Sequence, residues 1–265
     1  MSSLATPPVL SWGFRMSYET QATSSTPALI IYVLDVSVSM GQLLDGARRV
    51  DVVMDALGAA LRQMVFRSTK GARVSPRYRM GLFAYSHHVF DLLDGIKTVD
   101  EVASLGIPEL SPMRTTDTAR AFAQVEKLLQ REIPSIKHCP APLVCHMTDG
   151  EYTGDDPEPI IQRIRQMSVP DGHVLVENIF ISDRILAAPV TNPQRWPGIL
   201  ADTELESEYA RKLRVISSPL PETYRRTMIE SGYSLSPDAL MMLPGMNPEL
   251  VEMGFVMSAA TPILR

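Results

Sequence analysis

Oxygen-bearing side chains end two apolar runs of the sequence, and their types and spacing suit the binding of a hard cation. The run in YVLDVSVSMGQ stops at Asp35, and two hydroxyls follow at two-residue steps, on Ser37 and Ser39. The run in PLVCHMTDG stops at Asp149. Because these four side chains include no imidazole or thiolate, they suit Mg²⁺, Mn²⁺ or Ca²⁺ better than zinc.

A loop between the two runs offers further oxygens. In SPMRTTDTARAF, Thr115 and Thr116 stand just before a pattern typical of a helix. If the three loops meet, the four side chains named above and one of these threonines surround one cation, and neutral hydroxyls outnumber carboxylates among the five. A dication held in this way stays under-neutralised, so we expect it to accept one more negative oxygen from outside.

The elements that must position these oxygens alternate along the chain. The run PALIIYVLD (27–35) lacks polar alternation, which is typical of a central parallel strand buried on both faces. Further strands are predicted at 78–86, 142–150, 173–182 and 211–218, and helices at 47–66, 117–132, 157–167 and 221–231. This alternation predicts an α/β doubly wound fold, with a mostly parallel central sheet and helices on both faces.

The predicted topology also places the oxygens. We expect the strand at 28–34 to be central, between those at 78–85 and 142–147. In open α/β sheets, ligands bind at the carboxyl ends of strands, near the point where the strand order reverses. The three oxygen-bearing loops are expected at that edge.

One domain with extensions is the simplest organisation. We predict an N-terminal extension at 1–26, a domain at 27–231 with a loop insertion at about 184–210, and a C-terminal tail at 232–265. The tail is rich in methionine and proline, and its methionines fit either an adaptable partner surface or packing on the domain. Thirty-four residues are too few to bury a core of their own. We therefore expect the tail to pack on the domain.

The composition limits which classes of partner and which cellular compartment are expected. The chain has 265 residues with a formal net charge of −5, which argues against nucleic acid or an anionic membrane as the main partner. Two cysteines are too few for a disulfide framework and favour a reducing compartment. The apolar run ALIIYVL is seven residues long, far below the roughly 20 of a membrane helix. No signal peptide is visible at the N-terminus, and a cytoplasmic location is expected.

Two other clusters each allow two interpretations. HCPAPLVCH holds two cysteines and two histidines, but Cys145 and His146 are adjacent on a strand and must point to opposite faces. A buried Cys145 is therefore favoured over a zinc site. Glu151, Asp155 and Asp156 fit either a second cation site or a solvated acidic loop at a helix start, where negative charge is favourable.

The motif Asp35-x-Ser37-x-Ser39, the later loop threonine and Asp149-Gly150 together resemble the metal-ion-dependent adhesion site of von Willebrand factor type A domains. The resemblance covers roughly 27–231. It implies that Ser37, Ser39 and the threonine bind Mg²⁺ directly, while the two aspartates hold it mostly through water. It also implies that a Glu or Asp of a protein partner fills the open position.

The identity of the ligand threonine is open to choice, and two residues near the site depart from the family pattern. The spacing to the following helix in the family places the threonine role on Thr116, and Thr115 stays open. Val38 stands where the family often has glycine. Arg114 lies beside the site in sequence and could orient Asp149 or repel the metal.

The whole chain resembles bacterial single-domain members of the tellurite-resistance TerY type, in LVCHMTDGEYTGDDPEP and ISSPLPETY. Such proteins accompany kinases, phosphatases or chaperone ATPases in stress and conflict gene clusters. The resemblance implies a metal-dependent protein-binding adaptor rather than an enzyme. One alternative is a metal-free scaffold with the same fold. Another is a metal-assisted phosphoester hydrolase, which is disfavoured because neither an obvious base nor a phosphate-binding glycine loop is present.

Overall fold

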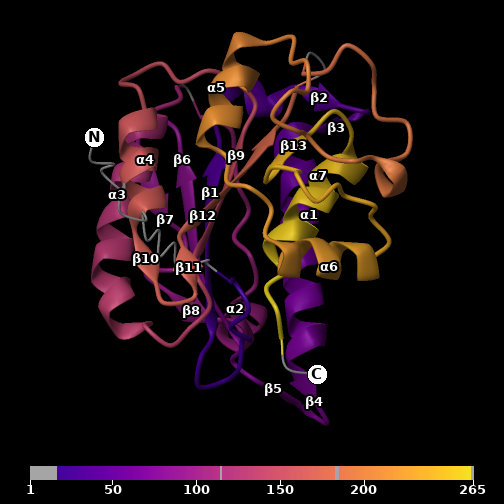
Figure 1. Ribbon diagram of the computed structural model, residues 1–265. Coiled ribbons are helices and arrows are strands. Elements are labelled where there is room, and N and C mark those ends of the chain that lie inside the picture. The colour runs from indigo at the N-terminus through magenta and orange to yellow at the C-terminus, as the bar shows by residue number, and fades with distance from the viewer. Residues whose placement is uncertain (1–16, 114, 183–184, 264–265) are drawn as a thin grey trace, which may run out of the picture.

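A mostly parallel sheet forms the centre of the computed structural model, which describes residues 17–113, 115–182 and 185–263 (Figure 1). The strands are ordered β13-β12-β9-β1-β6-β7, and β8 pairs with β6. Their bounds are β1 Ala28–Asp35, β6 Tyr78–Tyr85, β7 Val89–Asp91, β8 Lys97–Thr98, β9 Leu143–Thr148, β12 Leu175–Phe180 and β13 Met242–Pro244. Only β7 and β8 run antiparallel to their neighbour in this sheet.

The central position of β1 confirms the sequence prediction. All eight of its residues are buried, and it pairs in parallel with β6 on one side and β9 on the other. Asp35 is in register with Tyr85, and Leu34 with Met147. The chain adds β6 on one side of β1 and later β9 on the other, so the strand order reverses here. The carboxyl ends of β1 and β9 therefore form the crevice in which doubly wound sheets bind ligands.

Helices cover both faces of the sheet, as predicted (Figure 1). One face packs against α1 (Arg49–Ser68), α2 (Val99–Leu105), α6 (Glu222–Glu230) and α7 (Pro248–Ser258). The other face packs against α3 (Thr118–Glu132), α4 (Glu158–Gln166) and α5 (Glu208–Ile216). Three short hairpins and three 3-10 turns complete the list: β2 Leu43–Leu44 with β3 Ala47–Arg48, β4 Thr69–Lys70 with β5 Arg73–Val74, β10 Ser168–Val169 with β11 Gly172–His173, η1 Val38–Gly41, η2 Ile133–Ser135 and η3 Pro193–Arg195.

The strand predicted at 211–218 is wrong, because most of this segment is the helix α5. The side chain of Ser207 caps the helix by accepting a hydrogen bond from the Ala210 amide at 3.1 Å. The buried side chains recur at helical spacing, at positions 209, 210, 213 and 216. Only the last two residues leave the helix: Ser217 has an extended backbone, and the Ser218 amide donates to the carbonyl of Val176 in β12. The apolar residues at the end of the segment suggested a strand, but the cap at Ser207 and the spacing of the buried residues favour a helix.

The segment 232–265 supplies parts of both the sheet and a helix layer. Its strand β13 extends the sheet beyond β12, and sequence analysis did not predict it. In α7, the Phe255 ring stacks on Tyr32 of β1 with 5.7 Å between centroids, and Ser258 shares a 2.7 Å hydrogen bond with the Tyr32 hydroxyl. Buried methionines of this segment belong to the hydrophobic core: Met241, Met242, Met253 and Met257. The domain boundary at 231 stays a prediction.

Two further features bear on the sequence predictions. Cys145 packs in the core on the α1 and α7 side, whereas the ring of His146 packs edge-on against Phe122 of α3. The two side chains therefore lie on opposite faces of β9, as predicted. No helix within the described ranges combines the length and the apolar character that a membrane crossing requires.

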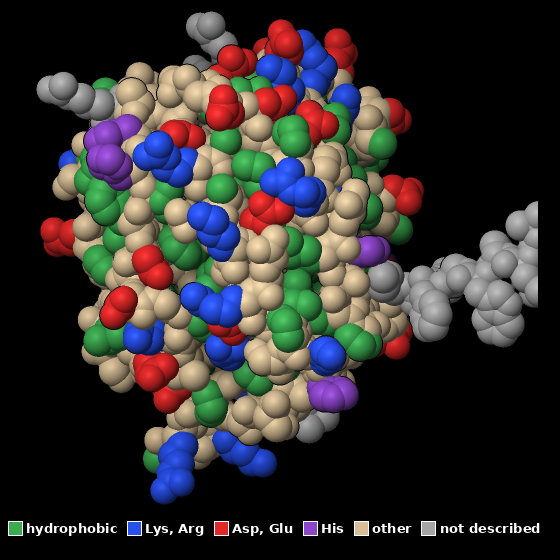
Figure 2. Space-filling view, turned by 90° about the vertical axis from the view of Figure 1, so that its left-hand side faces the viewer, with side chains coloured by type: hydrophobic (Ala, Val, Ile, Leu, Met, Phe, Trp, Pro, Cys, Tyr) green, Lys and Arg blue, Asp and Glu red, His purple; other side chains and the backbone are tan. Residues whose placement is uncertain are grey.

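The face that carries α3 and α4 mixes charges of both signs, with apolar side chains scattered between them (Figure 2). One ion pair on it joins Arg163 of α4 to Glu126 of α3, with 2.7 Å between Nε and Oε1. Such interspersed charge is typical of a solvated helix surface.

Candidate metal-binding site

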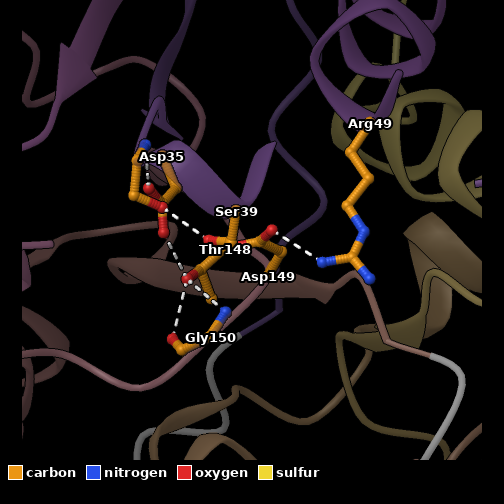
Figure 3. A network of polar contacts seen from close by, with 7 residues as sticks. Asp35, Ser39, Arg49, Thr148, Asp149 and Gly150 are labelled. Carbon is orange, nitrogen blue, oxygen red and sulfur yellow. Dashed lines mark hydrogen bonds and ion pairs between the residues drawn. The ribbon is translucent and has the colours of Figure 1, made fainter. Parts of the chain in front are cut away.

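Three of the predicted ligands lie in direct contact at the carboxyl edge of the sheet (Figure 3). The Ser39 hydroxyl donates to Asp149 Oδ1 at 2.7 Å, and the Ser37 and Ser39 hydroxyl oxygens lie 3.0 Å apart. Because the Ser39 hydrogen is directed to the carboxylate, Ser37 is the donor between the two serines. Lone pairs on both serine oxygens are left for a cation.

Backbone turns bring the two serines to the same side of the loop. After β1, the chain forms the 3-10 turn η1, in which the Met40 amide donates to the carbonyl of Ser37 at 3.0 Å. The Met40 side chain is fully buried and anchors the turn in the core. Ser37 precedes the turn with an extended backbone and Ser39 lies inside it, and in this arrangement the two hydroxyl oxygens lie 3.0 Å apart.

Asp35 lies behind the serines and is fully buried. Its Oδ1 accepts the Ser37 amide at 2.7 Å, and its Oδ2 accepts the Thr148 hydroxyl at 2.8 Å. Burial raises the pKa of Asp35 to about 6, against the hydrogen bonds from Ser37 and Thr148, which lower it. Asp35 therefore orients the Ser37 loop and supplies negative charge from behind. Sequence reasoning missed Thr148, although its place directly before Asp149 was a usable signal.

The loop with the two threonines lies beside the serines. The Met113 amide donates to the carbonyl of Val36, and Met113 forms an isolated parallel bridge with Ser37. Further along this loop, Thr116 is buried and Thr115 is exposed. The hydrogen bonds described for Thr116 join its backbone to Thr153. Burial favours Thr116 over Thr115 as the inward-facing residue, and its role as a ligand stays a prediction.

An arginine that sequence reasoning missed also reaches the site. Arg49, the first residue of α1, donates from Nη1 to Asp149 Oδ2 at 2.8 Å (Figure 3). The Arg49 side chain is 15% exposed and that of Asp149 is 0% exposed. Both carboxylate oxygens of Asp149 are thus engaged, one by a serine and one by a guanidinium. Arg114, the arginine singled out from the sequence, lies outside the described residues.

The oxygen spacing fits a magnesium shell. Mg²⁺ binds oxygen at about 2.0–2.1 Å in an octahedron, so neighbouring ligand oxygens lie about 2.9 Å apart. The two serine oxygens, 3.0 Å apart, lie close to that edge length, and the 2.7 Å from Ser39 to Asp149 is the length of a hydrogen bond to a carboxylate. In the part of the chain that the structure describes, no three His, Cys, Asp or Glu side chains cluster as a metal site. A cation here has to be held largely by hydroxyl oxygens.

The acidic loop after β9 is organised by a helix start. Asp156 Oδ1 accepts the Glu158 amide at 2.9 Å where α4 begins. Glu151 and Asp155 are exposed. This geometry favours a solvated acidic loop at a helix start over a second cation site.

The sequence matches no known protein family and no curated protein. Similar solved structures include the pilus adhesin SpaC from Lactobacillus rhamnosus GG, with a TM-score of 0.55 and 12% identity over 91% of this chain. They also include the SpRpn10 VWA domain, with a TM-score of 0.42 and 13% identity over 59% of this chain and 76% of that chain. A third is PTMP1 from the mussel byssus with a zinc-occupied MIDAS motif, with a TM-score of 0.44 and 14% identity over 61% of this chain.

The likeness to SpaC concerns the fold alone, because the identity is low. The fold is a doubly wound α/β fold. The chain spans 31% of the length of SpaC and 37% of the length of PTMP1. The similarity therefore says nothing about what this chain binds.

Proposed function

We propose that this chain is a von Willebrand factor type A-like module that binds a protein partner through a Mg²⁺-type cation, with Mn²⁺ or Ca²⁺ as substitutes. Ser37, Ser39 and Thr116 would contact the cation directly. Asp35 and Asp149 would balance its charge, mostly through water. When bound, the cation supplies a site for one further negative oxygen, which a Glu or Asp of the partner provides.

The observation that carries the proposal is the meeting of Ser37, Ser39 and Asp149 at the strand-order reversal, with the two serine oxygens 3.0 Å apart, close to the edge of a magnesium octahedron. The Ser39 hydroxyl donates to Asp149 and the Ser37 hydroxyl to Ser39, so oxygen lone pairs remain for a cation. A buried carboxylate, Asp35, stands directly behind them.

The biological setting is proposed from the sequence resemblance to the TerY type. In this setting the module is a cytoplasmic adaptor in a bacterial stress or conflict-response system. A kinase, phosphatase or chaperone ATPase encoded nearby would be its partner, and neither nucleic acid nor a membrane is expected to bind. Purification of the tagged chain from its native cells in magnesium and in EDTA tests this setting, because the partner must co-purify only with magnesium.

The metal step is tested by thermal unfolding with and without MgCl₂ or MnCl₂. At tenfold the dissociation constant, a bound cation stabilises the fold by about 1.4 kcal/mol. For a domain of this size the melting temperature rises by roughly 3–5 °C. Asp35→Ala is expected to abolish the rise. Asp55→Ala, which removes the same charge from the exposed face of α1, is expected to keep it.

A second candidate function is a metal-free protein-binding scaffold. It is favoured by one observation, the ion pair between Arg49 and Asp149, which already places a positive charge at the site. In this case partner binding survives EDTA and the Asp35→Ala change, and millimolar magnesium leaves the melting temperature unchanged. A phosphoester hydrolase stays the least favoured alternative.

A further inference from the structure

Arg49 lies at a position where the helix dipole disfavours a positively charged side chain. It is the first residue of the 20-residue helix α1, and helix N-termini carry partial positive charge. The compensation for this placement comes from another element, because Asp149 after β9 accepts its Nη1 at 2.8 Å. The guanidinium is therefore positioned by the site and not by its own helix.

This ion pair occupies the carboxylate that a cation needs. Ser39 engages Asp149 Oδ1 and Arg49 engages Oδ2, and the Asp149 side chain is 0% exposed. A dication that recruits this carboxylate meets a positive group only one hydrogen bond away. Either the guanidinium moves off Asp149 or two positive charges share one buried carboxylate.

The Arg49 contact is also incomplete. Only Nη1 donates to Asp149, and the buried Nε has no hydrogen-bond partner among the described residues. The neighbouring Arg48 differs, because it forms a two-pronged pair with Asp51 through Nε and Nη2, each at 2.7 Å, and is 54% exposed. Arg49 is thus held by one hydrogen-bonded contact rather than by a two-pronged pair, so a cation can displace it, but only by breaking an ion pair to a buried carboxylate.

We propose that Arg49 sets the cation affinity of the site by competing with the cation for Asp149. This inference rests on the proposed function. Without a cation, the guanidinium neutralises Asp149 and keeps the serine loop in place. A cation must displace it, so the wild-type chain binds cations more weakly than its oxygens alone would allow.

Isothermal titration with MnCl₂, repeated with MgCl₂, tests this proposal on the full chain and its variants. Arg49→Gln is expected to bind either cation at least tenfold more tightly than wild type. Arg48→Gln removes the same charge one residue earlier and is expected to stay within twofold of wild type. Arg49→Lys keeps the charge but loses the planar fork, so an intermediate affinity is expected. Arg49→Met replaces Arg49→Gln if that variant does not fold.

The outcomes separate the two proposals. If Arg49→Gln binds the cation more tightly than wild type does, the competition between Arg49 and the cation is supported. This holds even if wild type shows no binding at all, and wild type would then be the metal-free scaffold. Wild-type binding that Arg49→Gln leaves unchanged or weakens overturns the competition and leaves the metal-dependent function standing. If neither wild type nor any Arg49 variant binds Mn²⁺ or Mg²⁺, the metal-dependent function fails and the competition with it.

Discussion

The hydroxyl of Thr148 lies 2.8 Å from Oδ2 of Asp35, across two paired strands and 113 residues apart in sequence. Both side chains are fully buried. The carbonyl of Gly150 lies 3.0 Å from the same hydroxyl, but the carboxylate is the stronger acceptor, because charge-assisted hydrogen bonds are stronger than neutral ones. This contact joins the end of β9 to the end of β1 and holds Asp35 behind the serines.

Thr148→Val keeps the shape of the strand end and removes that hydrogen bond. The buried carboxylate then loses a donor, so we expect a loss of about 1–3 kcal/mol in the free energy of unfolding at pH 7.5 in EDTA. Urea denaturation measures it. Thr69→Val removes an exposed hydroxyl that donates to the carbonyl of Val65 and should change stability by less than about 0.5 kcal/mol. Equal losses in the two variants would contradict the proposed importance of Thr148.

Much of the site was predictable, because strand ends and side-chain types are local properties. The apolar run before Asp35 predicted a buried central strand, and the one before Asp149 predicted its neighbour. Arg49 was not predictable in this way, since its partner lies 100 residues further along the chain. A cation at the first residue of a helix, against the helix dipole, was the available signal.

Two fold elements show where local patterns are insufficient. The segment 211–218 ends in apolar and hydroxyl residues that favour a strand, but capping by Ser207 and the spacing of buried residues make most of it a helix. The three-residue strand β13 is too short for a periodic pattern. It forms because β12 offers a free edge, which is a tertiary effect.

His146 is predicted to make stability depend on pH. Its Nδ1 faces Asn178 Oδ1 at 2.9 Å and its Nε2 faces the Tyr85 hydroxyl at 2.8 Å. The Asn178 amide nitrogen donates to Ser217, so Oδ1 accepts and the imidazole carries its hydrogen on Nδ1. Burial lowers the pKa of His146 from 6.5 to about 4. The unfolded chain therefore takes up this proton first as the pH falls.

The contribution of neutral His146 is fully present above pH 6.5 and is lost as the pH falls to about 4, by about 3 kcal/mol in total. Asp35, whose pKa is raised, has the opposite slope in part of this range. The measurement is therefore the difference between wild type and His146→Gln in urea denaturation from pH 8 to pH 4. The stability advantage of wild type should shrink steadily below pH 6.5. A constant difference would exclude a neutral buried histidine.

Glu177 of β12 is predicted to destabilise the fold. It is fully buried, and within the described part of the chain no strong donor reaches its carboxyl oxygens, because the only group that faces them as a partner is the weakly donating Cys145 thiol of β9. Burial raises its pKa well above 4.5, so its stability contribution is present below pH 4.5 and is lost as the pH rises. Glu177→Met removes both carboxyl oxygens and should stabilise the protein by about 1–3 kcal/mol at pH 8.

The control for this prediction is Glu177→Gln, which keeps a polar group and removes the titration. Its stability relative to wild type should increase between pH 5 and pH 8. Urea denaturation at both pH values gives the comparison. A Glu177→Met variant that is less stable than wild type at pH 8 would indicate that the carboxyl group has a partner, such as a buried water.

Two helical glycines should respond to alanine with opposite signs. In an exposed helix interior, Gly→Ala stabilises by up to about 1 kcal/mol. At Gly58 of α1, a Cβ would meet only the mobile end of the Arg62 side chain, at 3.2 Å, so Gly58→Ala should stabilise. At Gly254 of α7, a Cβ would meet the Ile179 side chain of β12 at 2.6 Å. Gly254→Ala should therefore destabilise by about 1–3 kcal/mol through overpacking.

Thermal unfolding of both variants in the same buffer measures this contrast. Gly254→Ala combined with Ile179→Val should recover part of the loss, because valine lacks the Cδ1 atom that the new methyl group meets. This recovery separates a local clash from a general weakness of α7. If Gly254→Ala stabilised the protein as Gly58→Ala does, α7 could not lie this close to β12. The packing of the tail on the domain would then have to be rejected.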